Sequence, residues 1–160
     1  MSLFARMVSA GAQFANRRGV YAGRRSTKVH VRVYRWSRGR LGGHLPGRRG
    51  ARILLLDHVG AKSGVRRASP VIYVEAGDAV AIAASKAGQR VHPAWFHNLK
   101  ANPDTVIQIG GQVLPVRARV ADPGERDRLW PEFVAAVPDF AFYQRQAGQR
   151  VIPIVLLEPR

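Results

Sequence analysis

The sequence predicts a mainly β protein, a small β-barrel with flanking helices, in a chain of 160 residues. Short apolar or alternating runs follow one another from Arg52 onward, which is typical of strands. Turn signals at Ala76-Gly77 and Gly110-Gly111 separate neighbouring runs at hairpin spacing. Because helical patterns are few, successive hairpins favour an antiparallel barrel over a doubly wound parallel sheet.

The first fifty residues predict a basic arm with one or two helices. A loosely amphipathic pattern covers residues 2–15, and residues 26–37 predict a second basic helix with Ser26 or Thr27 as its N-cap. One face of that helix carries Val29, Val33 and Trp36, although the alternation of Val29, Val31 and Val33 would equally suit a strand. Residues 38–50 are rich in glycine and arginine, which indicates a loop. We therefore predict an arm over 1–50 and a barrel domain over 51–160.

The predicted elements of the barrel domain follow from alternation, turns and caps. Pro93 stands in the first turn of a short helix over 92–102, and Asn102-Pro103 ends it. Asp122 caps a helix that runs to about 137, with Pro123 at N1 and Glu125 at N3. Pro115, inside a strand, indicates an edge or a bulge. The predicted strands are 52–58, 69–75, 78–85, 105–109, 112–120 and 151–156, with a turn over 60–64 and a short segment over 140–146.

Charge is unevenly distributed along the chain. Residues 1–56 contain 13 of the 26 Lys and Arg and no acid, whereas all 10 acids follow. The net charge of +16 therefore belongs mainly to the first third, which would be drawn to phosphate backbones or anionic lipid headgroups. The absence of cysteine excludes a disulfide scaffold, a thiol nucleophile and a cysteine-zinc site, and it fits a reducing compartment. We expect no signal peptide and no membrane span.

The segment Gly60-Ala61-Lys62-Ser63-Gly64-Val65-Arg66-Arg67 lies between two predicted strands. Its glycines let backbone amides face an anion, Lys62 adds a point charge, Ser63 a hydroxyl and Arg67 a fork for phosphate or carboxylate oxygens. The segment lacks the spacing of a Walker A loop. The alternative is a hairpin turn with solvated charges.

Three further segments are candidates for a ligand site. Ala83-Ala84-Ser85-Lys86-Ala87-Gly88 could let a planar ligand approach closely, or simply end a strand with a snorkelling lysine. Trp95 and Phe96 suit either a core or a ring platform. Tyr143 could bond a ligand carbonyl or deliver a proton, or be half-buried packing.

His92 and His97 are five apart with no acid nearby in sequence, so we predict no metal site. No hydrolase motif is present.

Together, these motifs resemble the deazaflavin-dependent nitroreductase family of actinobacteria. The resemblance covers residues 30–158 and rests on their order: Gly-x-Lys-Ser-Gly-x-x-Arg, Pro-x-x-Tyr, Ala-Ser-Lys-x-Gly, His-Pro-Ala-Trp-Phe-His-Asn-Leu, Asn-Pro and a final Ile-Pro-Ile-Val. It implies a split β-barrel similar to FMN-binding flavin reductases. It also implies coenzyme F-420, an 8-hydroxy-5-deazaflavin with a phospholactyl-oligoglutamate tail, and hydride transfer to quinones, nitroaromatics or other electron-poor acceptors.

The resemblance also implies site residues, with Tyr143 as the catalytic candidate on the acceptor side. The implied cofactor-binding residues are Lys62, Ser63, Gly64, Arg67, Ala68, Ser69, Pro70, Val71, Ile72, Ala83, Ala84, Ser85, Lys86, Ala94, Trp95, Phe96, His97, Asn98 and Tyr143. Two positions depart from the family pattern. Ala61 stands where arginine is common, for which adjacent Arg66 could compensate, and Phe96 stands where tyrosine is common.

Alternative functions remain open at this point. The chain could bind or sequester the deazaflavin with little turnover, or use FMN, although the wide basic cluster favours the longer anionic tail. A nucleic-acid-binding role rests only on Tyr34-Arg35-Trp36, without a recognised nucleic-acid-binding motif, and we do not assign it. We expect a cytoplasmic protein whose residues 1–25 dock peripherally on the anionic inner face of the cell membrane.

Overall fold

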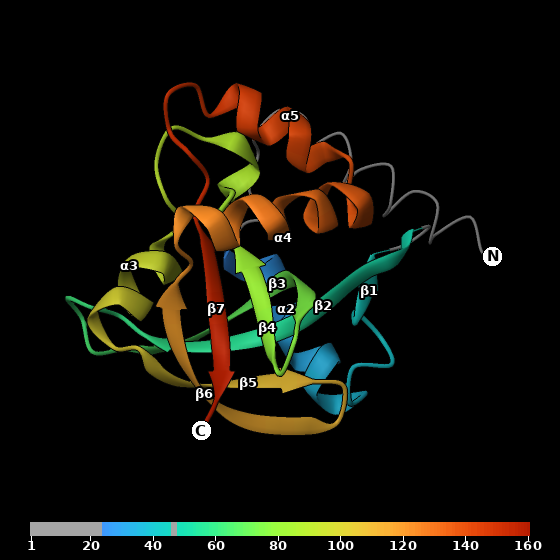
Figure 1. Cartoon of the computed structure of the whole chain (residues 1–160). Coiled ribbons are helices and arrows are strands. Elements are labelled where there is room, and N and C mark those ends of the chain that lie inside the picture. Colours follow the sequence, from blue (N-terminus) through green and yellow to red (C-terminus); the bar gives the residue numbers. More distant parts are fainter. Residues whose placement is uncertain (1–23, 46–47) are drawn as a thin grey trace.

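A computed structural model describes residues 24–45 and 48–160 of the chain (Figure 1). The predicted pattern over residues 2–15 lies outside these ranges. The elements, in chain order, are α2 (Arg24–Trp36), β1 (His44–Leu45), β2 (Arg48–Val59), β3 (Arg66–Ala76), β4 (Ala79–Ala83), a 3-10 turn (Lys86–Gly88), α3 (Ala94–Ala101), β5 (Asp104–Ile109), β6 (Gln112–Val120), α4 (Pro123–Ala136), α5 (Asp139–Gln146) and β7 (Ile154–Pro159).

Six antiparallel strands close into a barrel. Their order is β2-β3-β4-β7-β6-β5, and β5 pairs back onto β2 where Leu55 faces Gln108 and Leu56 faces Ile107. The short β1 extends the sheet beside β2. The last strand, β7, inserts between β4 and β6. The predicted mainly β fold, a split β-barrel with flanking helices, is confirmed.

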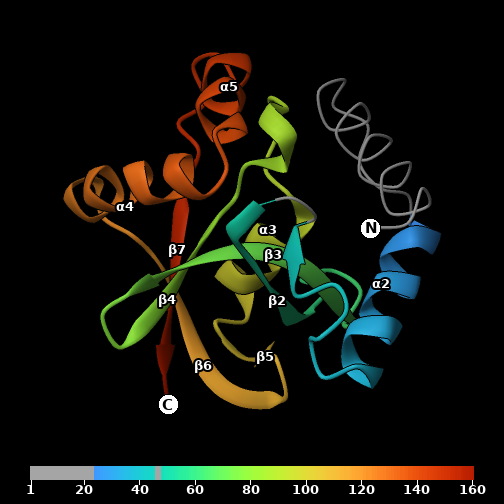
Figure 2. The same cartoon turned by 90° about the vertical axis from the view of Figure 1, so that its right-hand side faces the viewer.

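Several barrel strands are buried on both faces, which explains why their sequences are continuous apolar runs rather than alternating ones. In β2, Leu54 and Leu56 belong to one core cluster, whereas Ile53 and Leu55 belong to another with Tyr34 of α2. Along β4 and β7, alternate residues divide in the same way between the first cluster and a third one, which is shared with α4 and α5. Figure 2 shows the consequence: α2 covers one outer side of the barrel, and α4 and α5 cover the other.

Local signals in the sequence determine where α4 begins. The carboxylate of Asp122 accepts from the backbone N–H of Glu125 at 2.8 Å, and the carboxylate of Glu125 accepts from the N–H of Asp122 at 2.9 Å. This is the capping box that the sequence predicts. In the part of the chain that the structure describes, no helix is both long enough and apolar enough to cross a membrane.

Four predicted details differ from the structure. The loop predicted over 38–50 is wrong at its end, because β1 forms at His44–Leu45 and β2 begins at Arg48. Ser26 and Thr27 lie inside α2 rather than at its N-cap. Pro93 precedes α3 as its N-cap. The last strand begins at Ile154, three residues later than predicted. Cross-strand pairing rather than composition decides where β2 and β7 begin.

Pro115 fits the expected edge position. It pairs with Val106 of β5, but the pairing of β6 with β7 begins only at Val116. The missing N–H of proline therefore removes no bond to β7. The division into an arm over 1–50 and a barrel over 51–160 stays a prediction.

Candidate functional site

The turn between β2 and β3 presents an exposed group of cations. Lys62, Ser63, Gly64, Arg66 and Arg67 are all solvent-exposed. Among the described residues, none of the three cations forms an ion pair. Unneutralised cations at a turn with a left-handed glycine, Gly64 with φ +64°, are what an anionic ligand requires.

A buried hydrogen-bond network fastens this turn to α3. The side-chain oxygen of Asn98 accepts from the backbone N–H of Ala61 at 2.9 Å. The amide nitrogen of Asn98 lies 2.8 Å from Nδ1 of His58, and Nε2 of His58 lies 3.0 Å from Oγ of Ser69. His58 and Asn98 are both buried. The network therefore holds β2, β3, the turn and α3 in one arrangement.

The network also sets the protonation of His58. Because the oxygen of Asn98 is taken by Ala61, its amide N–H must donate to Nδ1 of His58, which leaves the proton on Nε2 for Ser69. Burial first, and the positive charge of Arg67 second, lower the pKa of His58 to about 4. His58 is thus a neutral, structural histidine at neutral pH.

This shift predicts an acid-sensitive fold. Unfolded His58 would titrate near 6.5 and folded His58 near 4, so the unfolded state binds the extra proton between these values. Stability is expected to be full above pH 6.5 and to fall by up to about 3 kcal/mol as pH drops to about 4. Urea unfolding at several pH values measures it, with His58→Gln as the variant that should lose this component. An equal slope in both proteins would contradict the assignment.

Helix α3 lies between the two halves of the predicted site. Trp95 and Phe96 are buried in the barrel core cluster, whereas Ala94 and His97 are exposed. The ring of His92 packs 4.7 Å from the ring of Phe96. Asn98 joins α3 to the β2–β3 turn, and His92 joins the segment just before α3 to the loop after β4, as described next.

The loop after β4 is held by the guanidinium of Arg150. This group donates to the carbonyl oxygens of Ala84 at 3.1 Å, Ser85 at 2.8 Å and Gln89 at 2.6 Å, and lies 3.2 Å from Nδ1 of His92. Lys86 has φ 48° and Ala87 has φ 50°, a left-handed backbone that costs non-glycine residues about 1 kcal/mol each. The three hydrogen bonds to carbonyl oxygens offset that strain and fix the position from which the side chain of Lys86 projects.

Tyr143 of α5 is packed beside the same loop. A Cβ at Gly88 would lie 2.8 Å from the carbonyl oxygen of Tyr143, so only glycine permits this approach. The side chain of Tyr143 is 5% exposed, and its hydroxyl has no hydrogen-bond partner among the described residues. Burial raises the pKa of Tyr143 to about 12. An orphaned buried hydroxyl is a group that a ligand could satisfy.

The predicted β3 and β4 residues divide between two faces of the sheet. Val71 and Ala84 pack with the barrel core, whereas Ile72 and Ala83 pack with the cluster under α4 and α5. Ala68, Ser69 and Pro70 are half-buried, with Ser69 in the His58 network. Adjacent strand residues point to opposite faces, so the side chains of these predicted residues do not all face one ligand.

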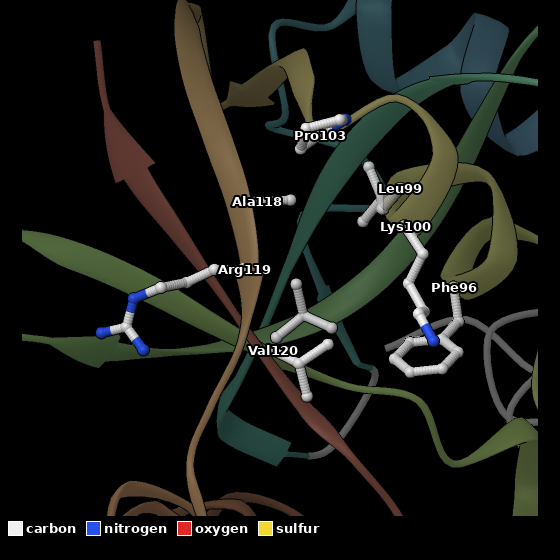
Figure 3. Close-up of a pocket in the computed structure, with 8 residues that line it drawn as sticks. Phe96, Leu99, Lys100, Pro103, Ala118, Arg119 and Val120 are labelled. Atoms are coloured by element: carbon white, nitrogen blue, oxygen red, sulfur yellow. The ribbon is translucent and has the colours of Figure 1, made fainter.

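A separate groove lies along the C-terminal half of α3 and beside β6 (Figure 3). Its volume is about 200 Å³, and the side chain of Lys100 lies over the ring of Phe96 at 6.0 Å. Of the predicted site residues it includes only Phe96. No cluster of three metal-ligating side chains occurs within residues 24–45 and 48–160.

Two residues that hold the predicted site together, His58 under the β2–β3 turn and Arg150 under the loop after β4, are not among those predicted from the sequence. His58 follows Leu54 and Leu56 at the same spacing of two residues, so its side chain points to the same side of the strand as theirs. A polar residue at an inward-facing position is the signal in the sequence that could have identified it. Arg150 carries no such signal, because its partners lie about sixty residues away.

A closed antiparallel barrel with helices on its outer sides, a cationic turn and a loop held in a left-handed backbone defines a split-barrel, flavin reductase-like protein. The comparisons with known proteins narrow this class. The chain belongs to the family described as "F420H(2)-dependent quinone reductase", which matches residues 26–159.

Individual relatives agree with this assignment. The chain is 46% identical over 107 residues to the Mycobacterium tuberculosis protein Rv3178, covering 67% of this chain and 89% of that protein. It is 38% identical over 136 residues to the F420H(2)-dependent quinone reductase Rv1261c of the same organism, covering 83% and 89%. A solved structure, described as an F420-H2 dependent reductase (FDR-A), superposes with a TM-score of 0.61 at 41% identity, covering 66% of this chain and 93% of that one.

Proposed function

We propose that the protein passes a hydride from reduced coenzyme F-420 to a quinone, and that the β2–β3 turn, α3, the loop after β4 and Tyr143 form the site. The enzyme class, the cofactor and the quinone acceptor come from the family. The single observation that supports this location is the cationic turn, because its three charges have no carboxylate partner in the described part of the chain. Nitroaromatics are further candidate acceptors.

Coenzyme F-420 fits these residues by charge. Its phosphate and glutamate carboxylates match Lys62, Arg67 and Lys86, with Ser63 as a hydroxyl donor. Arg66, exposed and beside Arg67, can replace the contact that Ala61 cannot supply. We place the flat ring at the small residue Ser85, which is half-buried, whereas Ala84 and Trp95 are packed in the barrel core.

When bound, the cofactor supplies the hydride, and the protein supplies position and electrostatics. Reduction of a quinone to a quinol takes up one hydride and one proton. We assign to Tyr143 the hydrogen bond to the acceptor oxygen or the delivery of that proton, since its hydroxyl has no other partner among the described residues. Its raised pKa keeps the proton on the oxygen at neutral pH.

Removing the turn charges is expected to weaken cofactor binding. The variant Lys62→Ala/Arg67→Ala should raise the Kd for coenzyme F-420 roughly tenfold or more, because each charge-assisted contact is worth about 1.5–3 kcal/mol. Titration of purified protein with cofactor measures this, with exposed Arg128→Ala on α4 as the control. A deazaflavin lacking the phosphate and glutamate tail should bind wild type and variant alike. Equal Kd values for the full cofactor would overturn the placement.

Replacing Tyr143 with phenylalanine is expected to separate stability from turnover. Deleting a buried hydroxyl that has no partner in the described structure should leave stability unchanged or raise it by about 1 kcal/mol. Reoxidation of reduced coenzyme F-420 by menadione should slow by roughly tenfold or more, with cofactor affinity kept. Unchanged turnover would remove Tyr143 from the mechanism, and a loss of stability would show that the hydroxyl is bonded.

The same assay decides between the remaining functions. Tight cofactor binding without menadione-dependent reoxidation would favour a binding or sequestering protein, and binding of FMN in preference to the deazaflavin would favour a flavin enzyme.

For localisation, the hypothesis is that residues 1–25 attach the protein to an anionic membrane. Their deletion should then lower co-sedimentation with anionic vesicles.

A further inference from the structure

Two buried side-chain polar atoms have no hydrogen-bond partner within the described part of the chain: the hydroxyl of Tyr143 and Nη1 of Arg48. Nearly every buried polar group in a folded protein is paired, so each exception needs a physical explanation. The hydroxyl of Tyr143 has a role in the proposed reaction. Arg48 stands at the start of β2, and no motif of the sequence includes it.

The start of β2 lies against the face of α5 that carries Tyr143. Nη2 of Arg48 donates to Oδ2 of Asp139 at 3.1 Å, and the two side chains are each 27% exposed. Asp139 and Tyr143 are four residues apart on α5, so their side chains share one face of the helix. Ala51, three residues after Arg48 on β2, packs in the same core cluster as Tyr143. The two atoms therefore face the same region between β2 and α5.

The ion pair with Asp139 uses only part of the Arg48 guanidinium. One nitrogen meets one carboxylate oxygen, whereas a fork-to-fork pair would join two nitrogens to two oxygens. The charge of Arg48 also acts on Tyr143: burial first and Asp139 second raise the pKa of Tyr143, and Arg48 lowers it. A cation that favours the ionised tyrosine would favour any other anionic oxygen at the same place.

We infer that Nη1 of Arg48 and the hydroxyl of Tyr143 donate to one and the same oxygen of the electron acceptor, which makes Arg48 a second catalytic residue. The inference rests on the proposed function. A carbonyl oxygen has two lone pairs and can accept from both donors. The hydride brings two electrons and one proton to the quinone, so one quinone oxygen carries a negative charge until a second proton binds. A buried guanidinium beside that oxygen offsets the charge as it develops.

Asp139 is a positioning residue in this arrangement, because it holds Nη2 and leaves Nη1 for the acceptor. Its own negative charge opposes an anionic oxygen, whereas the charge of Arg48 attracts one. Removing either side chain breaks the same ion pair, so both losses should lower stability. Their effects on the binding of an anion should nevertheless have opposite signs. A purely structural ion pair predicts the same sign for both.

Binding of an anionic acceptor analogue tests the inference. The probe is lawsone, a hydroxynaphthoquinone that is an anion at neutral pH, titrated calorimetrically into protein saturated with oxidised coenzyme F-420 so that no turnover occurs. Arg48→Gln should raise the Kd of lawsone roughly tenfold, because a charge-assisted hydrogen bond is lost. Asp139→Asn should bind lawsone at least as tightly as wild type. The control Arg35→Gln removes a cation that also has a carboxylate partner, Asp57 at 2.7 Å, and should bind as wild type.

Turnover with menadione tests whether the two donors share one oxygen. Arg48→Gln should lower kcat roughly tenfold or more, as the loss of a donor to a developing anionic oxygen does. Adding Tyr143→Phe should lower kcat little further, because the effects of groups that act as a unit do not add. If Arg48→Gln does not fold, Arg48→Lys keeps the cation but loses the fork, and it should still bind lawsone less tightly than wild type.

Two results would overturn the inference. Equal losses of lawsone affinity in Arg48→Gln and Asp139→Asn would show that Arg48 only fastens β2 to α5. Losses of kcat that multiply in the double variant would place the two donors on different oxygens. Either result leaves the proposed function intact as long as wild type reoxidises the cofactor with menadione. If wild type does not, the proposed function fails, whereas lawsone binding that depends on Arg48 would still support the paired donors.

Discussion

Replacing Asn98 with alanine is expected to lower the free energy of unfolding by about 2–3 kcal/mol and to weaken cofactor binding at least tenfold. The substitution leaves Nδ1 of buried His58 and the N–H of Ala61 without their partner, and a buried unsatisfied polar group costs about 1–3 kcal/mol. The binding loss follows because the turn that carries Lys62 and Arg67 is no longer fastened to α3. Urea unfolding and cofactor titration measure the two effects.

Lys100→Ala is the matched control for this prediction. It lies on the same helix, but its side chain is exposed and contacts the ring of Phe96 rather than the network. It should change stability by less than about 0.5 kcal/mol. If Asn98→Ala were as mild as the control, the network would not organise the site.

Replacing Gly88 with alanine is expected to have the largest effect on stability, a loss of about 3 kcal/mol or more. Gly88 has φ +74°, and a Cβ there would meet the backbone of Tyr143 at 2.8 and 2.9 Å. Backbone atoms of a packed helix cannot give way cheaply, so α5 must move or the loop must rearrange. Either response also displaces Lys86 and Tyr143, so turnover should fall together with stability.

Gly148→Ala is the control that separates the cost of a left-handed backbone from the cost of the collision with Tyr143. Gly148 has φ +66° and follows α5, but nothing lies within 4 Å of its added Cβ. It therefore keeps the strain of a left-handed alanine, about 1 kcal/mol, without the collision. Thermal or urea unfolding of the two variants gives the difference directly. Equal losses at both positions would mean that close contact between the loop and α5 contributes nothing.

Much of the barrel could be predicted from the sequence, because the signals are local. The capping box of Asp122 and Glu125, the turn over 60–64 and the hairpins at Gly77 and Gly110 depend on residues a few positions apart. The start of β2 could not be predicted in this way. Its first residues include Gly50, a residue of low strand propensity, and become strand because β1 pairs with them, Leu45 with Arg48 and His44 with Arg52.

In the candidate site, too, the parts with local signals could be predicted and the parts that depend on distant residues could not. The turn cations, the small strand-end residues and Asn98 carry sequence motifs. The residues that hold them in place carry no such motif, because His58 contacts Asn98 across 40 residues of sequence and Arg150 contacts Ser85 across 65. The outward face of α2 shows a related limit. Val29, Val33 and Trp36 form an apolar stripe in the sequence, but only the position of Tyr34 against β2 shows which side of the helix is inside.

The place of β7 between β4 and β6 affects how the protein is made. All five other barrel strands can form hairpins as they are synthesised, β2 with β3, β3 with β4 and β5 with β6, but β4 and β6 each keep an unpaired edge until residues 154–159 join them. A nascent chain that stops short of β7 exposes two long edges open to pairing with other chains. Incomplete chains are therefore expected to aggregate more readily than complete ones.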